Sequence, residues 1–111
     1  MKWFAISGSW RSQTPELVKD LSVAMDRIIQ NNDGIVSGGA LGVDYIATSA
    51  MLELSNWPER IKVIIPTSLE IYKNHYFRRA DEGVITHKQA SSLIDQLTKI
   101  KAGGGLDRNE L

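Results

Sequence analysis

The sequence contains no cysteine among its 111 residues, so neither a disulfide framework nor a thiolate metal site contributes to its fold. It also lacks an excess of charge, because 13 Lys and Arg residues balance 13 Asp and Glu residues. A molecule without net charge has no long-range attraction for nucleic acid or anionic lipid. No apolar run approaches the roughly 20 residues of a membrane span, and the first eight residues are too short for a signal peptide. We therefore expect a cytoplasmic protein.

The composition, with 42% hydrophobic and 23% charged residues, is typical of one globular domain. A chain of this length buries roughly two thirds of the surface that its unfolded form exposes, so it can fold without metal or disulfides. We expect the domain to span residues 1–101 and a Gly-rich polar tail to span residues 102–111. No spacing of His, Asp or Glu suggests a metal site, and we expect no cofactor.

Short β-branched or aromatic segments alternate along the chain with segments of helical periodicity. Strands are expected at residues 2–7, 34–37 and 61–65. Apolar residues at spacings of three and four predict helices over residues 14–30, 40–55, 68–82 and 86–101. Thr14 as N-cap and Pro15 begin the first helix, Asn32 or Gly34 ends it in the left-handed conformation, and Thr86 opens a capping box.

Three strands separated by long helices predict parallel pairing through right-handed crossovers, with helices on both faces of the sheet. The fold class is therefore α/β: a three-layer, Rossmann-like fold with a parallel sheet. The first strand is expected to be buried, but no later strand follows to pair with its outer edge. We infer a truncated or minimal version of a longer domain, with a second copy or a folded-back tail on this edge. A homo-oligomer is the expected assembly.

The most specific candidate site is the Gly-rich loop between the second strand and the second helix. Its glycines allow a sharp turn, and the N–H groups and positive dipole of the helix favour an anion there. Asp44, one turn inside, has the chemistry to accept a ribose hydroxyl, hold the loop or cap its N–H groups. In the purely structural alternative, Asp44 only caps and the glycines only turn. The candidate ligand-binding residues here are Ser37, Gly38, Gly39, Ala40, Gly42 and Asp44.

A second candidate loop follows the first strand. The carboxyl ends of neighbouring parallel strands form the edge at which open α/β sheets bind ligands. Hydroxyls and a guanidinium in this loop suit phosphate oxygens, although a plain polar turn is the alternative. Its candidate ligand-binding residues are Ser7, Gly8, Ser9 and Arg11. Neither loop matches G-x-G-x-x-G or the P-loop pattern, which argues against a dinucleotide oxidoreductase or a P-loop NTPase.

Residues 5–9 (AISGS) and 35–47 (IVSGGALGVDYIA) resemble the SMF/DprA-LOG superfamily of Rossmann-like nucleotide-binding proteins. The second segment is similar to the S-G-G-A-x-G-[IV]-D-x-x-A stretch of its DprA branch, although Thr48 stands where that pattern has His. The resemblance extends over residues 3–66 and, more loosely, from Tyr72 to Ile100. It implies a nucleotide pocket at both loops, and it identifies residues 107–111 as the start of a further helix.

Three functions follow from these patterns. The first is binding of a nucleotide or other phosphate-bearing molecule, as a sensor or accessory module. The second is hydrolysis of a nucleotide N-glycosidic bond, as in the LOG branch, with Asp44 as the only candidate catalytic residue in the two loops. That branch, however, has a P-G-G-x-G-T-x-x-E motif, and no Thr or Glu follows Gly42 as this motif requires. The third is weak binding of single-stranded DNA through Arg11, Arg78 and Arg79.

An aromatic and basic strip at residues 72–79 is a further candidate. Its rings and cations have the chemistry to stack a base and hold a phosphate. Alternatively, Tyr72, Tyr76 and Phe77 are packing residues, since positions 72 and 76 are one helical turn apart.

Overall fold

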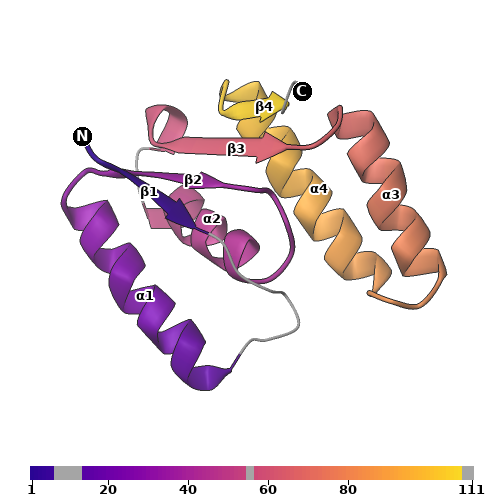
Figure 1. Cartoon of the computed structure of the whole chain (residues 1–111), viewed down its shortest axis with the longest axis horizontal. Helices are drawn as coiled ribbons and strands as arrows, with labels where there is room; N and C mark the ends of the chain where they lie inside the picture. The colour runs from indigo at the N-terminus through magenta and orange to yellow at the C-terminus, as the bar shows by residue number, and fades with distance from the viewer. Residues whose placement is uncertain (7–13, 55–56, 109–111) are drawn as a thin grey trace.

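The computed structural model describes residues 1–6, 14–54 and 57–108 (Figure 1). The elements in chain order are β1 (Trp3–Ile6), α1 (Pro15–Gln30), β2 (Gly34–Ser37), α2 (Val43–Leu54), the 3₁₀ helix η1 (Trp57–Glu59), β3 (Ile61–Ile65), α3 (Leu69–Asp81), α4 (His87–Ala102) and β4 (Leu106–Arg108). No helix in these ranges is long and apolar enough to cross a membrane.

The four strands form one parallel sheet in the order β1-β2-β3-β4. This confirms the expected small Rossmann-like α/β fold. Ile35 lies between Phe4 and Ile61 in the register, so all three side chains share one face of the sheet. The buried members of this face, with apolar residues of the helices, form the single hydrophobic core.

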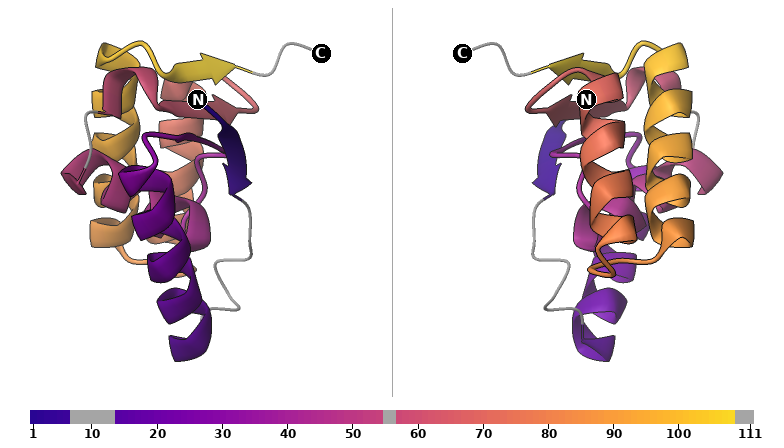
Figure 2. Two further views of the ribbon diagram at one scale, coloured as in Figure 1. Left: turned by 90° about the vertical axis from the view of Figure 1, so that its left-hand side faces the viewer. Right: turned by 90° about the vertical axis from the view of Figure 1, so that its right-hand side faces the viewer.

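The described helices cover one face of the sheet, not both as the sequence analysis expected. Each crossover moves to the next strand in the same direction, and right-handed crossovers of that kind place every helix on the same side. α2 packs on β1 and β2, α4 packs on β3 and β4, and α1 and α3 pack beside them (Figure 2). The burial of β3 alternates accordingly: Ile61, Val63 and Ile65 are buried, and Lys62 and Ile64 are exposed.

The uncovered face of the sheet carries apolar side chains. Trp3 is 40% exposed and Ile64 is 42% exposed. Gly34 lies beside Trp3, and a Cβ there would come within 2.6 Å of the indole ring. The Lys62 ammonium lies 4.6 Å from the centre of the same ring. We call the side chains on this side of the strands the open face; they include Trp3, Ala5, Val36, Lys62, Ile64 and Asp107.

Two expectations about the ends of the chain are wrong. β1 is an edge strand whose first three residues are exposed, so it is not buried. The described part of the tail does not cover that edge, because residues 106–108 form β4 beside β3, at the opposite edge, where a further helix was expected to start. Gly105 lets the tail approach β3 closely. Its carbonyl accepts the Val63 N–H at 2.8 Å, and a Cβ on Gly105 would lie 2.6 Å from the Ile61 carbonyl oxygen.

The local signals for helix ends are confirmed. Thr14 caps α1 by accepting the Leu17 N–H, and Thr86 and Gln89 form the capping box of α4. Asn32 has the left-handed conformation after α1, with φ of 56°. α2 begins at Val43, three residues later than expected, because residues 40–42 continue the turn out of β2.

Candidate functional site

The loop from β2 to α2 lies at the carboxyl end of the sheet, as predicted. Ser37 ends β2 and is 4% exposed. Gly39 and Gly42 have positive φ values of 71° and 91°, which side chains other than glycine rarely adopt. A Cβ on Gly39 would come within 2.9 Å of side-chain carbons of Val63 and Ile65. The loop is therefore folded tightly onto β3 before the chain enters α2.

Asp44, the second residue of α2, holds this loop. Its Oδ2 accepts the Gly38 N–H at 3.3 Å. Burial raises the pKa of Asp44 above its ordinary 3.8, while hydrogen bonds from the N–H groups of Ala40 and Gly38 oppose the rise. Two of the amides expected to bind a phosphate therefore face an internal carboxylate. The N–H groups that remain to bind a phosphate are the later ones, at the start of α2.

Two oxygen atoms at this end of β2 are buried without a hydrogen-bond partner: Ser37 Oγ and Asp44 Oδ1. Asp44 is only 5% exposed. Buried polar atoms nearly always have a partner, so each exception needs an explanation. A bound molecule with hydroxyl groups would supply partners to these oxygens only by displacing the groups that cover them, because neither oxygen is exposed and neither residue lines the groove described next.

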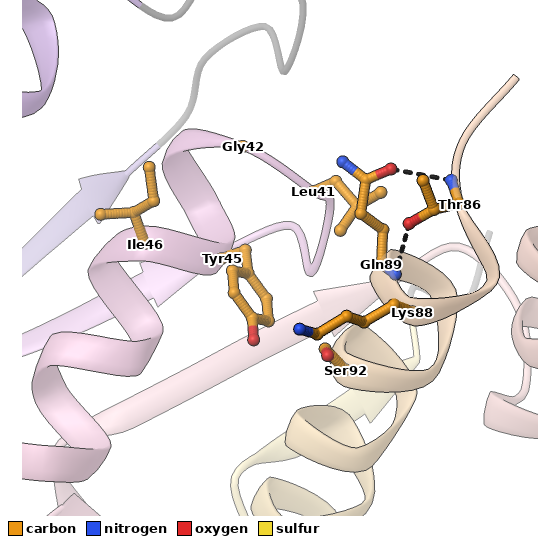
Figure 3. Close-up of a pocket in the computed structure, with 8 residues that line it drawn as sticks. All are labelled: Leu41, Gly42, Tyr45, Ile46, Thr86, Lys88, Gln89 and Ser92. Atoms are coloured by element: carbon orange, nitrogen blue, oxygen red, sulfur yellow. Dashed lines mark hydrogen bonds between the residues drawn. The ribbon is translucent and has the colours of Figure 1, made fainter. Parts of the chain in front are cut away.

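A groove of about 450 Å³ lies beside this loop, between the N-terminal ends of α2 and α4 (Figure 3). It is lined by Leu41, Gly42, Tyr45, Ile46, Thr86, Lys88, Gln89 and Ser92. Its volume is in the range of small-molecule sites. The Gln96 side chain donates hydrogen bonds to the Tyr45 carbonyl, at 3.2 Å, and to Ser49 Oγ, at 2.9 Å, and so fixes α4 against α2.

The side chains of Tyr45 on α2 and of Lys88 and Ser92 on α4 face the groove from two helices. The Lys88 ammonium and the Ser92 hydroxyl lie near the ring of Tyr45, with Lys88 extended across the space between α4 and α2 (Figure 3). Thr86 and Gln89 are occupied by their capping-box hydrogen bonds. The groove therefore combines an aromatic ring, a cation and a hydroxyl beside the positive ends of two helices, which suits an anionic ligand with a planar part.

The aromatic strip on α3 also contributes to this end of the molecule. Tyr72 is buried, and its hydroxyl donates to the Gly39 carbonyl at 3.0 Å. Burial and the hydroxyl of Tyr76 raise the pKa of Tyr72, and the charge of Asp44 adds to the rise, so Tyr72 remains a neutral donor. Tyr72 thus packs and supports the loop, and together with His75, Tyr76 and Arg79 it lines a separate hollow.

The predicted site residues fall into three groups. Ser37, Gly38, Gly39, Ala40 and Asp44 meet at the end of β2, and Gly42 joins the groove. The first loop lies outside the described residues, with its candidates Ser7, Gly8, Ser9 and Arg11. Sequence reasoning missed Tyr45, Lys88 and Ser92. Only the capping box at residues 86–89 signalled a helix N-terminus there, and nothing local placed it opposite α2.

Among residues 1–6, 14–54 and 57–108, no three His, Asp or Glu residues are grouped as a metal site requires. Comparisons with protein-family models, with curated proteins and with solved structures find no match to this chain. The class of protein that the structure defines is a small Rossmann-like α/β domain with a groove at the N-terminal ends of two helices. Membership of the SMF/DprA-LOG superfamily stays a prediction.

Proposed function

We propose that this chain binds a nucleotide, or another phosphate-bearing small molecule, across the N-terminus of α2. The observation that carries the proposal is the pair of buried, unpartnered oxygens, Ser37 Oγ and Asp44 Oδ1, at the end of β2. They lie where open α/β sheets bind ligands, at the carboxyl ends of the strands. The resemblance of residues 35–47 to nucleotide-binding SMF/DprA-LOG proteins supports the same site. The role is that of a sensor or accessory module.

The charges of the site orient the ligand. A phosphate next to an ionised Asp44 would be repelled, whereas a sugar hydroxyl would donate to its free Oδ1. Lys88 lies in the groove, on the α4 side of the α2 N-terminus, and supplies a cation. We therefore place the sugar toward Asp44 and the phosphate toward the first N–H groups of α2 and Lys88. The Tyr45 ring gives the groove a flat apolar surface for a base.

A thermal-shift screen against nucleosides and their mono-, di- and triphosphates tests the proposal. A ligand present at about 100 times its Kd adds about 2.7 kcal/mol of apparent stability. We expect a rise in Tm with phosphorylated members and a smaller one with free nucleosides. Lys88→Gln should weaken binding about two- to fivefold, and Lys99→Gln, on the last turn of the same helix, is the matched control. No shift with any nucleotide would contradict the proposal.

A second candidate function is hydrolysis of the N-glycosidic bond of a nucleotide. It is favoured by the state of Asp44, a buried carboxyl with a raised pKa and a free oxygen, as general acid–base catalysis requires. Incubation with nucleoside monophosphates, followed by chromatography for free base, tests it. Asp44→Asn should abolish release, and Asp95→Asn on α4 should not. If the wild type binds a nucleotide but releases no free base, hydrolysis is ruled out and only the binding function is retained.

We further propose that a second copy of the chain covers the open face. Parallel sheets are normally covered on both sides, and this face carries exposed Trp3 and Ile64. It also carries one cation and one anion, Lys62 and Asp107, so two copies of it are complementary in charge. Such a pairing is isologous, as in most homodimers.

A further inference from the structure

A second hollow of about 190 Å³ shares one lining residue, Leu41, with the groove. It is lined by Leu41, Tyr72, His75, Tyr76, Arg79 and Ile85. Because Leu41 lines both spaces, the two adjoin at this residue. The hollow contains none of the residues to which the proposed function assigns a role.

The side chains of α3 fix a guanidinium at this hollow. Arg79 donates from Nε to Nε2 of His75 at 3.0 Å. The His75 ring in turn stands edge-on to Tyr76, with ring centres 5.8 Å apart and an angle of 89°. Nε2 of His75 is the acceptor of this bond, and the positive charge is that of Arg79.

No carboxylate of the described residues pairs with Arg79. The one hydrogen bond between a carboxylate and a basic side chain within the described ranges joins Asp81 to His87, and those two side chains do not line the hollow. The terminal nitrogens of Arg79 remain as a fork of donors, a geometry that suits phosphate or carboxylate. Ile85 directly precedes Thr86, the N-cap of α4, so the positive end of that helix borders the same space.

We propose that this hollow is a second anion subsite, in which Arg79 binds a phosphate or carboxylate group of the ligand that occupies the groove. The inference rests on the proposed function in one respect, that the two spaces serve one ligand. It narrows the ligand class to nucleotides with two separated anionic groups. Leu41 is the side chain over which such a ligand passes.

The subsite is tested first without any nucleotide, by NMR titration with inorganic phosphate and, separately, with acetate. We expect phosphate to shift the His75 ring protons and the Arg79 Nε–H signal, and Arg79→Gln to abolish the His75 shift. Arg78→Gln, on the same helix and outside the hollow, is the control. Shifts with acetate alone would assign a carboxylate, and no shift with either anion would overturn the subsite, whatever the groove binds.

Isothermal titration with AMP and with adenosine 3′,5′-bisphosphate then tests whether one ligand joins the two spaces. The bisphosphate should bind at least about tenfold tighter than AMP, because a second charged contact is added. Arg79→Gln should remove this difference and leave AMP binding unchanged. Equal affinities in the wild type would overturn the joint ligand while leaving the proposed function intact. Absence of AMP binding would instead count against the groove.

Discussion

The carboxylate of Asp44 accepts the backbone N–H of Gly38, six residues earlier in the chain, with 3.3 Å between Oδ2 and the amide nitrogen. The Gly-rich loop therefore carries an internal anion on the amides that a phosphate would be expected to occupy. Its second oxygen is buried and has no hydrogen-bond partner. This relationship makes Asp44 both a support of the loop and a candidate ligand contact.

The pH dependence of the free energy of unfolding should reveal the raised pKa of Asp44. Burial raises its pKa, so the folded state keeps the Asp44 proton to higher pH than the unfolded state does. The wild type should therefore lose stability relative to Asp44→Asn as the pH rises from the ordinary value of 3.8 through the folded pKa. Urea unfolding of both proteins from pH 3.5 to 7 measures the difference. A difference that stays constant with pH would contradict the assignment.

The tight fit of the Gly39 backbone on β3 predicts a large effect of one added methyl group. Gly39→Ala forces a side chain into a positive φ and against Val63 and Ile65. Gly83 also has positive φ, but a Cβ there would meet nothing within 4 Å. Gly83→Ala should therefore lower the free energy of unfolding by about 1–2 kcal/mol, from backbone strain alone. Gly39→Ala should cost about 1–3 kcal/mol more. Equal losses in thermal unfolding would show that the loop is not tightly packed.

Arg60 should be a principal stabilising residue, although it pairs with no acid in the described ranges. Its buried guanidinium donates to the carbonyls of Ile28, Ile29 and Asp33, and so joins the end of α1 to the start of β3. Hydrogen bonds to a charged group contribute about 1.5–3 kcal/mol. Arg60→Met should lower the free energy of unfolding by at least that amount, as measured by chemical denaturation. Lys19→Met, at an exposed position of α1, is the control. A similar small loss of stability in both variants would refute the role.

Self-association through the open face is measurable by light scattering at increasing protein concentration. We expect a dimer in the wild type and a monomer in Ile64→Lys, which places a charge in the centre of the face. Lys62→Glu should weaken the dimer by repulsion from Asp107, and the double variant Lys62→Glu/Asp107→Lys should restore it. A wild type that remains monomeric at all concentrations would rule out this contact.

The sequence predicted those features that depend on neighbouring residues. The strands at 34–37 and 61–65 and the cap of α1 at Thr14 follow from local pattern and side-chain hydrogen bonds. β4 could not be predicted, because three residues after a Gly-rich turn become a strand only by pairing with β3. The open face could not be predicted either, because the strand order, and not the local pattern, decides on which side of the sheet the helices lie.

The candidate site likewise has one part that the sequence predicted and one that it did not. The Gly-rich loop and Asp44 were visible in the sequence because the loop and the helix start are contiguous. The groove was not, because Tyr45 and Lys88 are 43 positions apart and only the packing of α4 on α2, held by Gln96, brings them to one space. Helical periodicity places Lys88 on a helix but does not say which helix it faces.

The most direct test of the account is an NMR titration of the amide-labelled protein with AMP, with adenosine as the unphosphorylated comparison. If the ligand binds across the N-terminus of α2, AMP will shift the amides of residues 38–46 and 86–92, and adenosine will shift fewer of them. Shifts confined to other parts of the sheet, or none at millimolar AMP and other nucleotides, would contradict it.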